Sequence, residues 1–438
     1  MTTDTAPAPR LLTNGTIHST AEPYAESMLV EEGLIAWVGA EDTAERFAGG
    51  RGEGLVQQDL DRALVAPAFV GWVRSPLLEG TAPADCLPVL DEAVAHGYGA
   101  ARLSLEVSRE RFLGLSVETP DGEQSFDRYD APGVVEQLLR QVLQEAAGHP
   151  LPVFPTVRVA ELGGIDLEDP RSSSFLTELV QMLRILDEAA GTPLGIEVGL
   201  GDLFAGRTPD QAQEILMEIR RAANGAGRQL ILDASDDAGR ALTGEPASAV
   251  LQALVMTQRH LREERQTPSP AAPTILTGFD SASRQEWETL LNTGVHVVFR
   301  EPGHLATALS VGVPSSAAPA QGENPWTLVS GHVHHPEDPV SVRAGFNAQV
   351  RGAYRSLVGG QDSAAGAAGG QLNPGAPATY SVWEVDSLAV QTPDSRTAAW
   401  STDVRARTPL LPYLDGQSFP RLVQTVIAGA VLHGHDAG

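Results

Sequence analysis

The middle of the chain alternates short apolar runs with segments that carry apolar residues at every third or fourth position. The first run, at 64–73, reads LVAPAFVGWV, and further runs follow at 99–107, 151–159, 194–200, 228–235, 273–279, 295–300 and 307–313. Segments with helical spacing lie between them, for example at 134–147, 174–190 and 209–223. Strands that are apolar throughout and alternate with helices are typical of a parallel sheet. Eight such units predict an α/β fold with a (β/α)8 TIM barrel.

Both ends of the chain carry a different pattern, with short and partly alternating stretches bounded by turn residues. Residues 10–66 contain the turn pairs Asn14-Gly15 and Glu32-Gly33, and 378–385, 396–402 and 422–434 have strand character. Neither end is long enough to bury a sheet face alone, so we predict that both join in one small composite β-sandwich. Residues 337–357 predict one more helix. The domains expected are 1–64 and 361–438 for the sandwich and 65–360 for the barrel.

Composition narrows the function and the location. The formal net charge of −26 over 438 residues argues against nucleic-acid binding, which needs cations to neutralise phosphates. There is no apolar run of membrane-spanning length and no leader in the first ten residues, so we expect a cytoplasmic protein that does not enter a membrane. The single cysteine, Cys86, excludes an internal disulfide. All 30 basic residues are arginine, which excludes Schiff-base lysines and a carbamylated-lysine metal bridge.

Several phrases near the two ends resemble the amidohydrolase superfamily, the metal-dependent hydrolases of C–N and related bonds, and within it the branch that includes N-substituted formamide deformylase. They are LLTNGTIHS, MLVEEGLIAWVG and DLDRALVAPAF near the start, and ENPWTLV, RAGFNAQVRGAYRSL, GQLNPGAPATYSVWEV and PDSRTAAWSTDVRAR toward the end. The resemblance implies a barrel with one or two divalent metals at its mouth, where imidazole and carboxylate ligands activate a water molecule. It also implies a homodimer.

The metal-ligand positions of that family carry other residues in this sequence. Its first-strand HxH pair corresponds to Val73 and Ser75, and its fourth-strand ligand falls near Glu197. Its histidines on the fifth and sixth strands correspond to Asp233 and Thr277, and its eighth-strand aspartate falls near Ala317. We therefore expect the family's metal site to be lost and no cofactor to be bound. The alternative is that Glu197 and Asp233, with Asp236, hold a divalent cation such as Mg²⁺ or Zn²⁺.

Charged residues inside the predicted strands form the candidate pocket. They are Arg74, Arg102, Arg158, Glu197, Asp233 and Arg300. Buried charges must pair, so one interpretation is a set of ion pairs that fills the volume of the missing metals. The other is a pocket that recognises a small anionic molecule through arginine.

One histidine cluster, His332, His334 and His335, is interpreted as part of a helix and turn rather than as a relocated metal site, and His304 has no evident partner in the sequence.

Three functional hypotheses follow. The first is an amidohydrolase-like protein, catalytically inactive or strongly divergent, that binds a small molecule. The second is an active hydrolase of amides, formamides or cyclic imides with an unusual metal site. The third is a structural subunit. An open, arginine-lined mouth favours binding, whereas a mouth filled by Trp72 and ion pairs favours the structural role.

Overall fold

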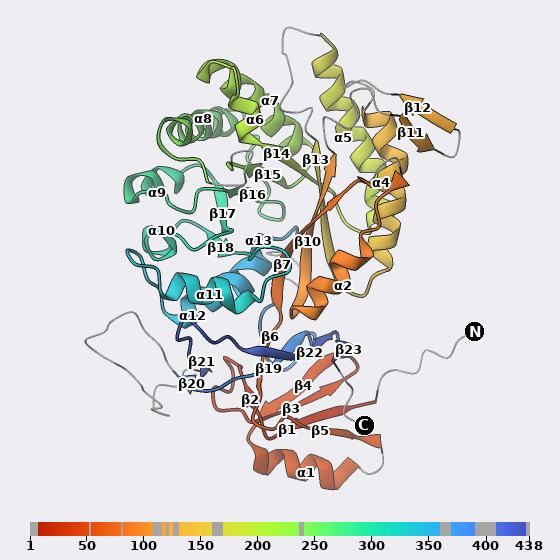
Figure 1. Cartoon of the computed structure of the whole chain (residues 1–438), viewed down its shortest axis with the longest axis vertical. Coiled ribbons are helices and arrows are strands. Elements are labelled where there is room, and N and C mark those ends of the chain that lie inside the picture. The colour runs from red at the N-terminus through yellow and green to blue at the C-terminus, as the bar shows by residue number, and fades with distance from the viewer. Residues whose placement is uncertain are drawn as a thin grey trace.

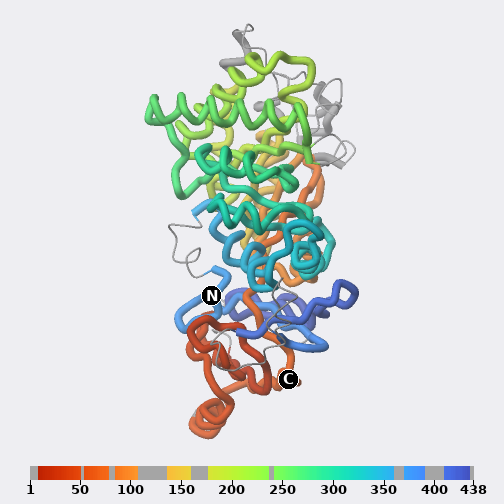
Figure 2. Tube along the Cα trace, turned by 90° about the vertical axis from the view of Figure 1, so that its left-hand side faces the viewer, coloured from red at the N-terminus to blue at the C-terminus, as the bar shows by residue number. Residues whose placement is uncertain are grey.

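The computed structural model describes residues 8–51, 54–79, 82–107, 116–119, 122–125, 131–159, 170–235, 241–359, 369–389 and 409–434. A barrel of strands and helices occupies one end of the molecule, and a smaller β-domain built from red N-terminal and blue C-terminal segments occupies the other (Figures 1 and 2). No helix in these ranges is long and apolar enough to cross a bilayer.

Eight parallel strands form the main sheet, which confirms the predicted barrel fold. In spatial order they are β7 (Phe69–Pro76), β10 (Tyr98–Val107), β13 (Val153–Val159), β14 (Gly195–Gly199), β15 (Leu230–Asp233), β16 (Thr274–Thr277), β17 (Val295–Phe299) and β18 (Ser315–Ala317). The helices that follow these strands include α4 (Ala131–Gly148), α5 (Pro170–Ala190), α7 (Pro209–Gly225), α8 (Gly244–Glu263) and α9 (Arg284–Leu290). A single apolar core lies between the strands and these helices.

The eighth strand does not lie where the sequence pattern predicted it. The run at 307–313 belongs mostly to helix α10 (Leu305–Val311), and the strand is β18, a few residues later. Leu305 and Ala308 are buried one helical turn apart, whereas Leu309 is exposed, which is the pattern of a helix. Gly312 ends that helix in the left-handed conformation, with φ of 91°.

The first run, 64–73, is divided between two sheets. Strand β6 (Leu64–Pro67) pairs in the smaller domain, and barrel strand β7 begins at Phe69. Pro67 cannot donate a ladder hydrogen bond, so it suits the point where the chain leaves one sheet for the next.

The two edge strands of the barrel sheet, β7 and β18, are not hydrogen-bonded to each other. A helical segment packs against both of them. The segment consists of the π-helical turn η3 (Ala348–Gly352) and α13 (Ala353–Ser356), which follow α12 (Val342–Asn347). It covers most of the helix predicted at 337–357. Gly352 permits the close approach, since a Cβ there would lie 3.1 Å from the Ser315 carbonyl oxygen.

The smaller domain confirms the predicted composite sandwich. One sheet has the order β4-β3-β1-β5 and comes from the N-terminal segment, with β1 (Arg10–Thr13), β3 (Ser27–Glu31), β4 (Leu34–Gly39) and β5 (Val56–Asp59). The other has the order β2-β6-β19-β22-β23 and joins β2 (Thr16–Ile17) and β6 to β19 (Tyr380–Glu384), β22 (Arg421–Ile427) and β23 (Ala430–His433). The strand expected at 396–402 lies outside the described residues.

Candidate functional site

Alternate residues of the barrel strands face the inside of the barrel. Trp72 packs there against an apolar set from four other strands and their ends: Ile231, Ile275, Val298 and Ala318. Trp72 is 1% exposed and fills the middle of the barrel. Because side chains alternate along a strand, Arg74 lies on the same inner face, one step closer to the carboxyl ends of the strands.

A polar layer lies below Trp72, toward the amino ends of the strands. Arg102 donates hydrogen bonds to Gln229 Oε1 at 2.5 Å and to the Ser356 carbonyl oxygen at 3.1 Å, so α13 closes this end of the barrel. Its guanidinium lies over the Trp72 ring, 5.0 Å from the centroid. Burial lowers the pKa of Arg102 to about 10 and that of His296 to about 3. His296 is hydrogen-bonded to Ser316 at 2.8 Å.

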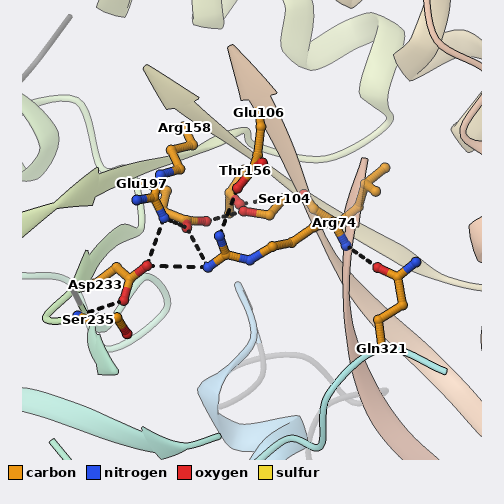
Figure 3. Close-up of polar contacts among 10 residues, drawn as sticks. Arg74, Ser104, Glu106, Thr156, Arg158, Glu197, Asp233, Ser235 and Gln321 are labelled. Carbon is orange, nitrogen blue, oxygen red and sulfur yellow. Dashed lines mark hydrogen bonds and ion pairs between the residues drawn. The ribbon is translucent and has the colours of Figure 1, made fainter. Parts of the chain in front are cut away.

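Above Trp72, two arginines bridge two buried carboxylates (Figure 3). Arg158 Nη1 lies 2.7 Å from Asp233 Oδ2 and 3.2 Å from Glu197 Oε1. Arg74 Nη2 lies 3.3 Å from each of the same two oxygens. Arg74 Nη1 also pairs with Glu106 at 2.7 Å. We call Arg74, Arg158, Glu197 and Asp233 the ion-pair quartet.

Neighbouring groups hold the quartet in place. The Ser104 hydroxyl donates to the second oxygen of Glu197, and the Ser235 backbone N–H donates to Asp233 Oδ1 at 3.1 Å. The Gln321 side chain accepts the Arg74 backbone N–H at 2.9 Å. Burial alone would raise the pKa of the Asp233 carboxyl, but Arg158, the Ser235 N–H and Arg74 together hold it below its usual value. Asp233 is therefore charged at neutral pH.

Arg300 follows β17 on the inner face and lies outside this network. Its guanidinium lies over the Trp72 ring at 4.7 Å, on the carboxyl-end side. Its Nε and Nη1 atoms are buried, and neither has a hydrogen-bond partner in the part of the chain that the structure describes. The nearby Asp280 carboxylate accepts the backbone N–H of Arg300, at 3.0 Å, instead of its side chain. Burial and then the charge of Arg74 lower the pKa of Arg300.

The structure places the residues aligned with the family's metal ligands in two groups. Val73 and Ala317 pack in the outer core between strands and helices. Ser75, two residues after Val73, shares its face of β7. The residues that face the barrel interior at these points are Trp72, Arg74 and Ala318, one position away from the alignment. Glu197, Asp233 and Thr277 do face the interior, and the Thr277 hydroxyl is buried without a partner among the described residues.

A divalent metal of the family type does not fit the side chains present. Across the described ranges, no group of three or more His, Cys, Asp and Glu side chains is arranged to hold a metal ion. Glu197 and Asp233 are each contacted by two guanidiniums, and Glu106 pairs with Arg74. The inner residues at the other ligand positions are Trp72, Arg74, Thr277 and Ala318. Asp236 lies outside the described residues.

The histidine cluster near 332 belongs to the packing around α11 (Pro325–Val333). His332 packs edge-on against Phe299, with centroids 5.5 Å apart, and His334 is hydrogen-bonded to the Leu414 carbonyl oxygen at 3.0 Å. His304 and His335 pack edge to face at 5.4 Å.

Sequence reasoning missed the polar neighbours of the predicted charges. Ser104, Gln229, His296 and Ser356 all contact the interior, and three of them lie in or beside apolar strands. Ser104 follows Arg102 by two residues, a spacing that places both on one face of a strand. This spacing could have identified Ser104 as an interior residue from the sequence.

No protein-family model matches the sequence, and no curated protein matches it. Solved structures with a similar fold include atrazine chlorohydrolase from Arthrobacter aurescens TC1 complexed with zinc, with a TM-score of 0.58 at 13% identity over 97% of this chain and 95% of that chain. Triazine hydrolase from Arthobacter aurescens has a TM-score of 0.57 at 13% identity over 98% and 95% of the two chains. E. coli guanine deaminase has a TM-score of 0.56 at 11% identity over 98% of each. At this identity the similarity shows the fold.

Proposed function

We propose, from a fold shared with triazine hydrolase and guanine deaminase, that this chain binds a small molecule at the carboxyl ends of its barrel strands and does not catalyse metal-dependent hydrolysis. The similarity of fold agrees with the resemblance to the amidohydrolase superfamily drawn from the sequence. The observation that carries the proposal is the ion-pair quartet, in which guanidiniums occupy the carboxylate oxygens that a metal would need.

The electrostatics of the quartet oppose a divalent cation. Asp233 Oδ2 and Glu197 Oε1 each have two guanidinium nitrogens within 3.3 Å. A metal at these oxygens would displace both arginines and place two further positive charges beside them. Retention of a catalytic metal requires three or more converging ligands. The inner residues at the family's other ligand positions, Trp72, Arg74, Thr277 and Ala318, offer a single hydroxyl, that of Thr277.

Partial exposure of the quartet supports binding over a purely structural role. The side chains of Arg74 and Arg158 keep 34% and 24% of their surface exposed, and that of Glu106 keeps 40%. Trp72 and the quartet do fill the centre of the barrel, as the structural hypothesis requires. That hypothesis, however, gives no reason for Arg300, whose Nε and Nη1 atoms have no hydrogen-bond partner among the described residues.

Metal content and hydrolytic activity test the proposal together. The full chain is purified without chelator and analysed for metal before and after incubation with zinc and manganese, and each preparation is assayed on an amide, a formamide and a cyclic imide. We expect neither retained metal nor hydrolysis.

A stoichiometric metal together with hydrolysis that Asp233→Asn abolishes would overturn the proposal and favour an active C–N hydrolase. The matched control is Asp187→Asn, which removes the carboxylate that faces Arg228 at 2.9 Å outside the barrel interior. A contaminating activity would survive in both variants.

A further inference from the structure

We propose that Arg300 and Thr277 form the anchor for one anionic oxygen group, a carboxylate or a phosphate, of the small molecule that the barrel binds. The inference rests on the proposed function and names the chemistry of its ligand. Three observations lead to it: unsatisfied buried donors, an uneven distribution of charge, and a rigid aromatic support.

The first observation is the pair of polar groups without partners. Buried polar atoms in folded proteins almost always have a hydrogen-bond partner, so each exception needs an explanation. Arg300 Nε and Nη1 and Thr277 Oγ1 are such exceptions within the described ranges. Thr277 pairs in register with Val298, and Arg300 follows Val298 by two residues on the same strand face. Both side chains therefore belong to the inner surface at the carboxyl ends of β16 and β17.

The second observation is how the interior charges are distributed. Arg74, Arg102, Arg158 and Arg300 face the barrel, and the carboxylates paired with arginine there are Glu106, Glu197 and Asp233. Arg102 is satisfied by neutral acceptors from Gln229 and Ser356. Arg300 alone among the four has no acceptor in the described part of the chain. An anion would supply both the missing charge and the missing acceptors.

The titratable groups around Arg300 do not fill this role. Glu197 and Asp233, whose charges act on Arg300, are paired with Arg74 and Arg158. The Asp280 carboxylate is turned to the backbone N–H of Arg300, and burial raises its pKa to about 6. Tyr98 donates its hydroxyl to the Glu323 carbonyl oxygen at 3.2 Å. The lowered pKa of Arg300, caused by burial and by the charge of Arg74, means that a bound anion would stabilise the charged guanidinium.

The third observation is the support beneath Arg300. The Trp72 ring packs against apolar side chains of β15, β16 and β17, and the Arg300 guanidinium lies over its face at 4.7 Å. A cation stacked on an aromatic face keeps its in-plane N–H groups free for an oxygen ligand. The guanidinium is therefore held in place before a ligand arrives, which reduces the entropy lost on binding. Arg300 as a residue keeps intermediate exposure, while its Nε and Nη1 atoms are buried.

The experiment is a calorimetric titration of the full chain at low ionic strength with three probes: acetate, benzoate and inorganic phosphate. Benzamide, which has the shape of benzoate without the charge, is the neutral comparison. We expect saturable binding of one anion per chain for at least one probe. Benzoate preferred over phosphate indicates a carboxylate ligand, and the reverse order indicates a phosphate ligand.

Variants locate the anion. We expect Arg300→Gln to weaken binding by about tenfold to a hundredfold, which is the contribution of hydrogen bonds to a charged group. Thr277→Val removes one neutral donor and should weaken binding by roughly threefold. Arg300→Lys keeps the charge without the planar arrangement of donors and should lie between the wild type and Arg300→Gln. The matched control is Arg259→Gln, which removes the same charge from a side chain that is 72% exposed on α8.

Two outcomes would overturn the inference: no saturable binding of any of the three anions, or equal affinity in Arg300→Gln and the wild type. Thermal melting of each variant confirms that it is folded. Metal analysis of the same preparations separates this test from that of the proposed function. Retained metal would contradict the proposed function. The affinity of Arg300→Gln for the anions tests the role of Arg300 independently of that result.

Discussion

Asp233→Asn is the sharpest single test of the ion-pair quartet. The substitution keeps the size of the side chain and an oxygen that can accept a hydrogen bond from the Ser235 N–H. In the wild type this N–H donates to Asp233 Oδ1 at 3.1 Å. It removes the negative charge that faces Arg158 at 2.7 Å and Arg74 at 3.3 Å. Both guanidiniums are then left with Glu197, which has no exposed surface, and Arg74 also with Glu106.

The expected loss of stability follows from burial. Removing one partner of a buried ion pair costs about 3–5 kcal/mol, because the remaining charge loses its compensation. Arg74 and Arg158 keep 34% and 24% of their side-chain surface exposed, so water relieves part of that cost. We therefore expect Asp233→Asn to lower the free energy of unfolding by about 2–3 kcal/mol.

Urea denaturation, followed by both tryptophan fluorescence and circular dichroism, measures this loss, and agreement of the two probes shows whether one transition is involved. The control is Glu263→Gln in the pair with Arg259, whose side chains are 60% and 72% exposed. That change should cost less than about 0.5 kcal/mol. An Asp233→Asn loss no larger than the control would refute the view that the quartet is a tightly paired, buried network.

Two further predictions concern buried groups whose charged form is destabilised by the loss of solvent. Arg300→Met should raise the free energy of unfolding of the ligand-free protein by about 1 kcal/mol, since the relief of buried unpaired nitrogens outweighs the lost contact with Trp72; a lower urea midpoint for the variant would contradict this. Burial lowers the pKa of His18 and His332 to about 4 and that of His296 to about 3, against about 6.5 in the unfolded chain. The unfolded chain therefore binds more protons below that value, and stability should fall as the pH drops from about 6.5 toward 4. Urea midpoints across this range should fall less steeply for His296→Gln than for the wild type, and parallel curves would count against this assignment.

Seven of the eight barrel strands could be predicted from their apolar runs, because a buried parallel strand is apolar throughout. The same property hides which face of the strand looks inward. On β7 both faces are buried, so the inward-facing Trp72 and Arg74 could not be distinguished from Val73 and Ser75 by pattern.

The charged members of the site were predictable and their pairing was not. Arg158, Glu197 and Asp233 interrupt apolar strands, and that contrast alone marks them as interior charges. Which arginine remains without a partner depends on distances across the barrel, between strands that are far apart in sequence. That Arg300 lacks an acceptor within the described ranges is therefore visible only in three dimensions.

The pairing of β6 with β19 has a consequence for dissecting the protein. Leu64 lies opposite Trp383 in this sheet, so the first and last parts of the chain complete a single layer. The Ser356 carbonyl oxygen at the amino end of the barrel comes from the same late part of the sequence. No single cut in the chain separates a barrel from a sandwich with all strands of each. Expression of either terminal part of the sandwich without the other should leave an unpaired sheet edge, so the sandwich is better studied in the intact chain.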